Sequence, residues 1–342
     1  MPKFEGLLLP PPIEPMETRQ VPKIPEGATW SYEPKWDGFR CIAFRDKNDV
    51  ELQSKSGETL TRYFPEIVEA LLAAKEARFV TDGELMVPSG DGADFDALLQ
   101  RIHPAESRIR KLAAETPATY VLFDLLLSGR SKLFEEPLRK RRLRLEDFIH
   151  ENFAESAGVG LSPATEDPEL ARQWLAGSLA RLDGVIAKKD VPYGFASRDA
   201  AVKIKRSYGA DCVVGGFRKS SGGAIASLLL GLYDEAGLLH HVGFVGSMGA
   251  ADRKRAAELL EPIVEPPGFT GAAPGGPSRW RRGADAEWFP VRTKIVVEVA
   301  FDHTTARRFR HAARLLRWRP DKAPRQCTMD QLLNPTERSG SL

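Results

Sequence analysis

The sequence predicts an α+β domain of antiparallel sheets and helices, followed by a smaller β-barrel domain of the OB-fold type. Its 342 residues exceed what one hydrophobic core usually holds, so two domains are expected. Residues 41–206 alternate strand-like and helical segments, whereas residues 207–303 are mostly strand runs separated by glycines. We expect the boundary near residues 206–210, which gives domains 1–208 and 209–342.

The composition is that of an ordinary soluble protein, with 42% hydrophobic and 28% charged residues. The N-terminal "MPKFEGLLLPPP" is interrupted by prolines, and no apolar run approaches membrane-spanning length. We therefore expect neither a signal peptide nor a membrane span. Cys41, Cys212 and Cys327 lie far apart without C-x-x-C spacing, which favours a reducing compartment and excludes a zinc site made of cysteines.

The first domain should begin with an irregular, proline-rich arm over residues 1–29. Apolar and β-branched runs predict strands at 41–46, 78–87, 119–127, 184–189 and 201–206. Helical spacing predicts helices at 64–76, 138–150 and 167–181, the last with Asp167 as N-cap and Pro168 at its first position. In the second helix we expect an inward face of Leu138, Leu143, Leu145 and Phe148, with the arginines outward.

The second domain should be built from strands. Strand runs occur at 211–223, 226–237, 239–249 and 293–303, with one helix at 250–264 and a Pro/Gly-rich loop at 265–283. About five strands with one intervening helix are typical of a small barrel such as an OB-fold.

One lysine lies in an unusual place, within the aromatic and apolar run "SYEPKWDGFR" at 31–40. Either Lys35 extends to solvent from a strand end, or its amine is a reagent. K-x-D-G would occur by chance in roughly four of a hundred chains of this length. Alone, the motif favours an ordinary lysine before an Asp-Gly turn.

Further segments occur in a fixed order along the chain, and together with K-x-D-G they resemble the covalent nucleotidyltransferase superfamily, and within it the ATP-dependent DNA ligases. The segments are "EPKWDGFR", "LQSKSGETLTRYFPE", "VTDGELMV", "YVLFDLL", "LDGVIAKK", "AVKIKR" and "RFRHAARLLRWRPDK". The C-terminal segment and the lack of a further N-terminal domain are most similar to the stand-alone bacterial type called LigC. We therefore expect neither the polymerase module nor the nuclease module of end-joining ligases.

The resemblance implies that the Lys35 amine attacks the α-phosphorus of ATP and expels pyrophosphate. An unperturbed lysine has a pKa of about 10.4 and is protonated near neutrality. Burial and neighbouring cations favour the uncharged amine. We therefore expect the apolar neighbours of Lys35, together with Lys203, Lys205 and a divalent metal, to keep it uncharged.

The resemblance also implies nucleotide contacts. Glu33 would face the adenine edge, Phe123 would stack on the ring, and Glu84 would hold the ribose hydroxyls. The remaining implied contacts are to ribose or phosphates: Arg40 (nucleotide or nick phosphate), Lys55, Lys203 and Lys205 (α-phosphate), and Arg319 and Lys322 (pyrophosphate). Asp183, with Glu84, would bind Mg²⁺ or Mn²⁺.

Two positions depart from the family pattern. Asp183 stands where the family usually has glutamate, and Lys55 where it has arginine, so metal contact and bidentate ribose or phosphate contact are altered there. Each role also has a plainer alternative. Phe123 could be strand core, Glu84 a solvated carboxylate, Asp183 a turn residue, and the lysines of "AVKIKR" the solvated face of an edge strand.

A basic segment near the C-terminus predicts contact with nucleic acid. Residues 307–325 contain seven arginines and one lysine against a single acid. Such residues contact phosphates without sequence preference. The alternative is a basic amphipathic helix or a solvated face. The predicted DNA contacts are Arg62, Lys188, Arg307, Arg308, Arg310, Arg314 and Arg317, with positive loops at 217–223 and 279–283.

The resemblance therefore implies an enzyme that seals nicks in duplex DNA with ATP, through lysyl-AMP and DNA-adenylate intermediates. We expect a monomer that acts in DNA repair with repair polymerases, in the bacterial cytoplasm near the nucleoid. Two alternatives stay open: an RNA ligase or capping-type guanylyltransferase of the same superfamily, and a non-catalytic DNA-binding relic.

Overall fold

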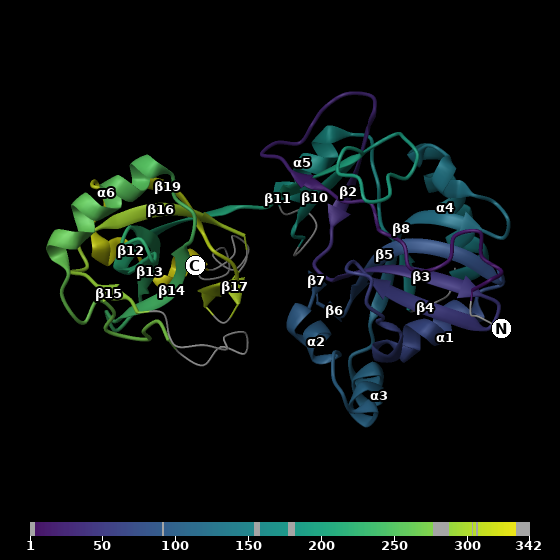
Figure 1. The fold of residues 1–342 in the computed structure, drawn as a ribbon, viewed down its shortest axis with the longest axis horizontal. Coiled ribbons are helices and arrows are strands. Elements are labelled where there is room, and N and C mark those ends of the chain that lie inside the picture. Colours follow the sequence, from purple (N-terminus) through teal and green to yellow (C-terminus); the bar gives the residue numbers. More distant parts are fainter. Residues whose placement is uncertain are drawn as a thin grey trace. The chain divides into compact units, whose positions relative to one another are not determined.

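The computed structural model describes residues 4–90, 92–153, 158–176, 182–275, 287–302, 304–305 and 307–332. The chain divides into two compact units, Met1–Arg206 and Ser207–Leu342 (Figure 1). In the described part of the chain, no helix is both long enough and apolar enough to cross a bilayer.

The first unit contains two sheets with helices packed around them (Figure 1). The larger sheet has the order β4-β3-β5-β8-β9 and is antiparallel except for the parallel pair β8 and β9. Its strands are β3 (Phe39–Asp46), β4 (Asp49–Ser54), β5 (Arg78–Met86), β8 (Thr119–Ser128) and β9 (Val159–Leu161). The predicted strands at 41–46, 78–87 and 119–127 are confirmed.

The smaller sheet has the order β1-β11-β10-β2. It consists of β1 (Arg19–Gln20), β2 (Trp30–Lys35), β10 (Gly184–Lys189) and β11 (Ala201–Lys205), and a separate hairpin joins β6 (Pro88–Ser89) to β7 (Gly92–Ala93). β1 runs parallel to β11, and the other pairs are antiparallel. The two predicted strands at 184–189 and 201–206 are confirmed as neighbours.

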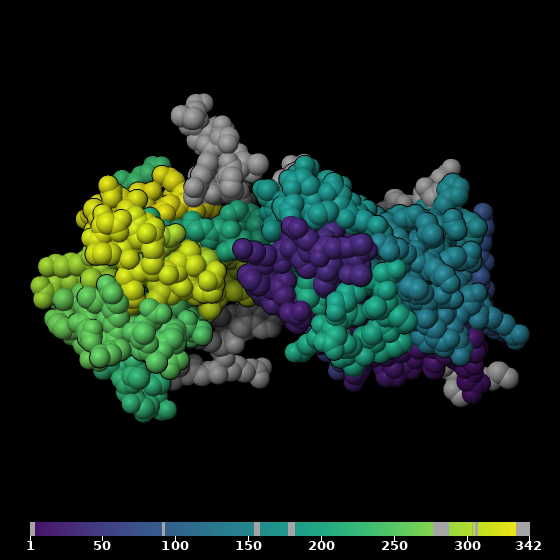
Figure 2. Space-filling model, turned by 90° about the horizontal axis from the view of Figure 1, so that it is seen from above, coloured from purple at the N-terminus to yellow at the C-terminus, as the bar shows by residue number. Residues whose placement is uncertain are grey.

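The N-terminal arm is mostly irregular, as predicted, and lies over the surface of the first unit (purple in Figure 2). Phe4, Leu7 and Met16 are buried in a cluster with side chains from β3, β5 and β8. The Met16 N–H also donates to the Tyr193 hydroxyl at 3.0 Å. The arm is therefore part of the folded unit.

The helices of this unit are α1 (Pro65–Ala73), α2 (Phe95–Gln100), α3 (Glu106–Glu115), α4 (Leu138–Phe153) and α5 (Pro168–Ala176), with the short 3₁₀ helices η1 (Thr61–Tyr63) and η2 (Leu133–Glu135). The three predicted helices correspond to α1, α4 and α5. The last part of the third prediction, residues 177–181, lies outside the described residues.

The predicted inward face of α4 is confirmed for Leu138, Leu145 and Phe148 and is wrong for Leu143. Leu143 is 63% exposed, whereas Arg141 is buried and binds the buried Asp124 through two hydrogen bonds of 2.7 and 2.9 Å. Residues 138, 141, 145 and 148 form one helical stripe, and Leu143 lies off that stripe. The prediction failed because it assigned every arginine to solvent, although a paired arginine can belong to the core.

The described residues of the second unit form an antiparallel sheet, a separate two-stranded sheet and one α-helix (Figure 1). The order is β14-β13-β12-β16-β19, and β15 also pairs with β12. The long strands are β12 (Tyr208–Lys219), β13 (Ile225–Tyr233), β14 (Leu239–Val245), β16 (Val296–Phe301) and β19 (Arg314–Trp318). The remaining elements are α6 (Ala250–Leu260), β15 (Phe289–Pro290), β17 (Thr304–Thr305), β18 (Arg308–Phe309) and the 3₁₀ helices η3 (Glu261–Ile263), η4 (Pro324–Gln326) and η5 (Met329–Leu332).

Five long strands and one intervening helix agree with the prediction for this unit. The basic amphipathic helix considered for the C-terminal segment is wrong, because Arg314–Trp318 form β19 beside β16. The α+β prediction is thus confirmed at the level of two units with sheets and helices. Along the described ladder the sheet has two ends, β14 and β19.

We expect Arg141→Met to destabilise the first unit by about 3–5 kcal/mol, because it leaves Asp124 buried without its charge partner. Burial alone would raise the pKa of Asp124, but Arg141 outweighs burial and lowers it. Urea unfolding monitored by circular dichroism measures the change. The exposed Arg144 is the control, and Arg144→Met should stay within about 0.5 kcal/mol of the parent. Equal stability of both variants would contradict this account of α4.

Candidate nucleotide-binding site

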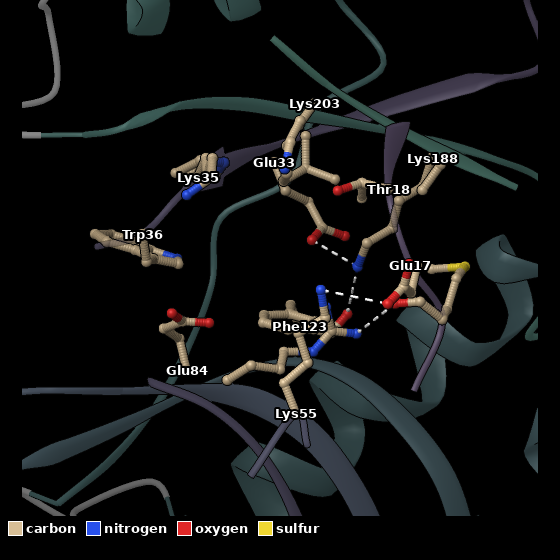
Figure 3. A pocket seen from close by; sticks show the side chains of 15 residues that line it. Glu17, Thr18, Glu33, Lys35, Trp36, Lys55, Glu84, Phe123, Lys188 and Lys203 are labelled. Carbon is tan, nitrogen blue, oxygen red and sulfur yellow. Dashed lines mark hydrogen bonds and ion pairs between the residues drawn. The ribbon is translucent and has the colours of Figure 1, made fainter. Parts of the chain in front are cut away.

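A cavity of about 220 Å³ lies between the two sheets of the first unit (Figure 3). Residues from β2, β10 and β11 line one side, and residues from β3, β5, β8 and the end of β4 line the other. The lining includes these predicted site residues: Glu33, Lys35, Arg40, Lys55, Glu84, Phe123 and Lys203. Side chains far apart in the sequence are therefore gathered around one space.

Lys35 is the last residue of β2 and points into this cavity. Its amine forms an ion pair with the carboxylate of Asp183, and the Asp183 N–H donates to the Lys35 carbonyl at 2.9 Å. The Asp183 side chain is only 6% exposed. The sequence predicted apolar residues, cations and a metal around Lys35, so an acid in direct contact with its amine was not foreseen.

Glycine is required two positions before Arg40, where β3 begins against β5. A β-carbon on Gly38 would lie 2.2 Å from the Leu85 carbonyl oxygen. This close approach places Glu84, which is paired with Arg40 in the strand register, on the cavity wall. Burial raises the pKa of Glu84 to about 7, although the charges of Lys35 and Arg40 act against it.

Arg40 is held rigidly by groups that the sequence did not single out. Its guanidinium donates to both oxygens of the fully buried Asp82, at 2.6 and 2.5 Å, and Asp82 also accepts from the Tyr193 hydroxyl at 2.7 Å. The guanidinium carbon lies 4.9 Å from the centre of the Phe123 ring. Arg40 thus packs against the aromatic ring on the cavity wall. No sequence signal for Tyr193 was available, because it lies 111 residues from Asp82.

The two lysines of β11 differ in position. Lys203 lines the cavity, and its pKa is lowered by burial and then by the charges of Lys35 and Lys205. Lys205 is two residues further along the same strand, opposite Gly184 in the register, and is not among the lining residues. Of the two predicted phosphate-binding lysines, only Lys203 therefore lines the cavity.

The N-terminal arm contributes to the same wall, which the sequence did not predict. Met16, Glu17 and Thr18 line the cavity. A carboxylate oxygen of Glu17 lies 3.4 Å from the Lys55 amine, and its other oxygen accepts from Arg198 Nε at 2.5 Å. The lysine that departs from the family pattern thus faces an acid from the arm.

Lys188 was predicted to contact DNA, and the structure corrects this. Its side chain is 5% exposed and its amine lies 2.7 Å from a carboxylate oxygen of Glu33 on the cavity wall. An ammonium group buried in this way is sequestered from the phosphates of a duplex. The half-buried Lys189 beside it gave the same sequence signal, so the sequence pattern alone could not separate the two lysines.

The protein side chains predicted to bind a metal ion at this site are two carboxylates, those of Asp183 and Glu84. In the described parts of the chain, no group of three or more His, Cys, Asp or Glu side chains is arranged to hold one. Asp183 and Glu84 both act on Lys35, the first by direct contact and the second through its charge. Mg²⁺ takes few protein carboxylates and completes its shell with water and phosphate oxygens. The two carboxylates fit that mode of binding.

In the second unit, Arg319 lies within a group of acids. Its Nη1 donates to Asp211 at 2.8 Å, and its Nε and Nη2 donate to Asp321 at 2.9 Å each. Glu298 Oε2 lies 3.6 Å from Nη1, and the Lys322 amine lies 3.7 Å from Asp211. Both predicted pyrophosphate contacts therefore share Asp211, which sequence reasoning missed.

The predicted DNA contacts of the second unit lie on and around its C-terminal strands. Arg307, Arg308, Arg314 and Arg317 are exposed, and Arg310 is half-buried. Arg317 also donates to Glu298 at 2.5 Å. In the first unit, Arg62 is exposed and donates to the Pro104 carbonyl at 2.8 Å. The predicted positive loop at 279–283 lies outside the described residues.

Arg308 also binds a buried histidine. Its Nη2 lies 2.8 Å from His241 Nδ1, and since arginine only donates, Nδ1 must accept and the ring proton must be on Nε2. His241 is 6% exposed. Burial, followed by the charges of Arg308 and Arg218, lowers the pKa of His241 to about 3.

This histidine predicts a pH dependence of stability. Below pH 6.5 the unfolded chain takes up a proton that the folded ring excludes until about pH 3. The unfolding free energy should fall as pH decreases through this window, by up to about 1.4 kcal/mol per pH unit from this residue. His241→Asn should flatten the decrease, measured by denaturant unfolding at pH 7, 6, 5 and 4. Substitution of the exposed His311 by Asn should leave the slope unchanged, and an equal slope in both variants would refute the assignment.

Comparison with known proteins agrees with this site. Residues 15–205 match the family model of the ATP dependent DNA ligase domain, and residues 221–322 match that of the ATP dependent DNA ligase C terminal region. The chain is 45% identical to DNA ligase C1 of Mycolicibacterium smegmatis and 44% identical to DNA ligase C of Mycobacterium tuberculosis, covering 95% of both chains in each case. A solved structure of a Lig E DNA ligase shares the fold, with a TM-score of 0.53, 16% identity and coverage of 89% of this chain and 100% of the other. The chain belongs to the family of ATP-dependent DNA ligases.

Proposed function

We propose that this protein seals nicks in duplex DNA with ATP, through a covalent bond between Lys35 and AMP. The observation that carries the proposal is the position of Lys35 in a cavity whose walls also present Glu33, Phe123, Glu84 and Lys203. An amine, an aromatic ring, carboxylates and a second cation are the groups that a nucleotide-transfer site requires. Family membership supports this function over the RNA ligase, capping and non-catalytic alternatives.

The reaction has three steps. The Lys35 nitrogen attacks the α-phosphorus of ATP, a bond from nitrogen to phosphorus forms, pyrophosphate leaves, and the amine loses its proton. A 5′-phosphate oxygen of the nick then attacks the same phosphorus and releases Lys35. Finally the 3′-hydroxyl attacks the 5′-phosphate and AMP leaves. Such transfers depend mostly on positioning and charge neutralisation.

The walls of the cavity would position the nucleotide. Phe123 would stack on the adenine, with its ring backed by Arg40, and Glu33 would face the adenine edge. Glu84 would hold the ribose hydroxyls. Lys203, with its partly buried amine, would hold the α-phosphate, and Lys55 and Lys205 would add positive charge at the phosphates.

Asp183 has two successive tasks in this scheme. Before ATP binds, it would hold the Lys35 amine at the cavity wall. Asp183 and Glu84 would bind Mg²⁺ or Mn²⁺, which would supply charge neutralisation at the phosphates. The aspartate is one methylene shorter than the family's glutamate, and direct contact with Lys35 brings it into reach of the reacting atoms.

We further propose that residues 1–208 form the adenylation domain and residues 209–342 an OB-fold domain. The strand order β14-β13-β12-β16-β19 and the bridge between Val245 and Ala313, just before β19, support a five-stranded barrel closed between the two end strands. The arginines of this domain and Arg62 would contact phosphates of nicked DNA without reading sequence. Action as a monomer in bacterial DNA repair, alongside repair polymerases in the cytoplasm, completes the proposal.

Lys35→Ala should abolish the addition of one AMP to the protein, detected by whole-protein mass spectrometry after ATP treatment. Sealing of nicked DNA should fall on the order of 10³-fold or more, because the nucleophile is lost. Lys35→Arg should fail equally, since arginine preserves the charge beside Asp183 but is not a nucleophile. Lys75→Ala, at an exposed site, is the control. Sealing by Lys35→Ala at the parental rate would refute the proposal.

Arg319→Ala should slow only the first step. Because Arg319 would orient pyrophosphate, the rate of self-adenylylation should drop at least about tenfold, whereas sealing of a pre-adenylated nick should remain near the parental rate. Single-turnover assays with ATP and with pre-adenylated DNA measure the two steps. Equal losses in both assays would assign Arg319 to DNA binding or folding instead.

A further inference from the structure

Lys188 and Glu33 form a buried ion pair at one end of the cavity (Figure 3). The amine and the carboxylate oxygen are 2.7 Å apart, and the side chains are only 5% and 3% exposed. The two residues come from paired strands, since Glu33 in β2 is opposite Ile186 and Lys188 is opposite Ser31 in the register. The pair therefore joins two neighbouring strands of the smaller sheet.

The Lys188 amine also contacts Phe123. It lies 4.5 Å from the centre of the ring and 3.5 Å from the Phe123 carbonyl oxygen. The same ammonium group thus touches both side chains that flank the base in the proposed nucleotide site. Glu33 lines the cavity, and one of its carboxylate oxygens accepts from Lys188.

Two other charged residues lie near Glu33. Arg142 from α4 and Asp124 from β8 act on it through space. Arg142 donates through Nε to Glu146 at 2.7 Å, while its buried Nη1 has no hydrogen-bond partner, and Asp124 is bound by Arg141. In the described residues, Lys188 is therefore the cation in direct contact with the Glu33 carboxylate. Burial raises the pKa of Glu33, and Lys188 acts against that rise.

We propose that Lys188 determines base specificity, by holding Glu33 ionised and oriented toward position 6 of the purine so that adenine is selected over guanine. It is a positioning residue that acts through Glu33. This inference rests on the proposed ATP-binding function of the cavity.

The chemistry follows from the donors and acceptors at position 6. Adenine presents an amino group there, which donates, and guanine presents a carbonyl oxygen, which accepts. An ionised carboxylate can only accept, so it binds the amino group and repels the carbonyl oxygen. Without Lys188, a carboxylate buried at this depth would be neutralised by a proton. A protonated Glu33 could donate to guanine, and the discrimination would weaken.

The test is the rate of self-adenylylation or self-guanylylation with α-labelled ATP or GTP over a range of concentrations. Lys188→Met should raise the KM for ATP and lower the ATP-over-GTP preference, each by about tenfold to a hundredfold. Glu33→Gln should have a similar effect. The double variant should be no worse than Glu33→Gln alone, because both changes remove the same contact.

Lys188→Arg, which keeps the charge, should retain the preference for ATP. The matched control is Lys189→Met, because Lys189 is the next residue of β10 and packs on Trp30, with its amine 5.6 Å from the centre of that ring. The Lys189→Met variant should keep the parental KM for ATP and the parental ATP-over-GTP preference. Should Lys188→Met fail to fold, as judged by circular dichroism, Lys188→Gln keeps a donor without the charge and carries the same expectation.

Two results would overturn the inference: a parental ATP-over-GTP preference in the folded, uncharged Lys188 variants, or effects of Lys188 and Glu33 that multiply in the double variant. Failure of the parent protein to form any AMP adduct would instead overturn the proposed function. The two failures are therefore distinguishable in one series of measurements.

Discussion

The pairing of β2 with β10 is the constraint on which the whole site depends. It sets Lys35 opposite Gly184 and Glu33 opposite Ile186, and it brings Asp183 to the Lys35 carbonyl. A β-carbon on Gly184 would lie 2.0 Å from the Ile204 carbonyl oxygen, so the absence of a side chain lets β11 approach and add Lys203 to the cavity. A shift of one residue in this register would turn these side chains to the opposite face of the sheet.

Arg40, Lys188 and Lys55 on the cavity wall have protein counterions, and these pairs fall into two classes. Arg40 and Lys188 bind acids that are almost completely buried, Asp82 and Glu33, and form fixed walls around Phe123. Lys55 is 61% exposed and meets Glu17 only at 3.4 Å, so a phosphate can replace that acid at small cost. We infer that the two buried ion pairs shape the base pocket, whereas exposed cations such as Lys55 bind the phosphates. Arg319 is bound by Asp211 and Asp321, so it must release at least one of these carboxylates in order to contact pyrophosphate.

Much of the site could be predicted because its chemistry is concentrated in short, ordered motifs. Glu84, Phe123 and Lys203 lie on strands that their apolar runs predicted, and alternation along a strand shows which residues share a face. Glu33 and Lys35 lie on β2, which no predicted strand covered, and only the ordered motifs singled them out. The remaining features depend on contacts between distant segments. Lys188 is identical in type to its half-buried neighbour Lys189, and only the pairing of β10 with β2 shows which of the two is fully buried. Arg141 could be placed in the core only by knowing that Asp124 is buried next to it. The contribution of Glu17 depends on the path of the N-terminal arm, which no local sequence pattern specifies.

The most direct test of the central claim is to locate the nucleotide after incubation of the protein with ATP. Proteolysis under conditions that preserve the bond between nitrogen and phosphorus, followed by tandem mass spectrometry, assigns the modified residue. The account predicts one AMP on the peptide that contains Lys35 and on no other lysine. An adduct at Lys203, Lys188 or any other side chain, with Lys35 unmodified, would contradict it.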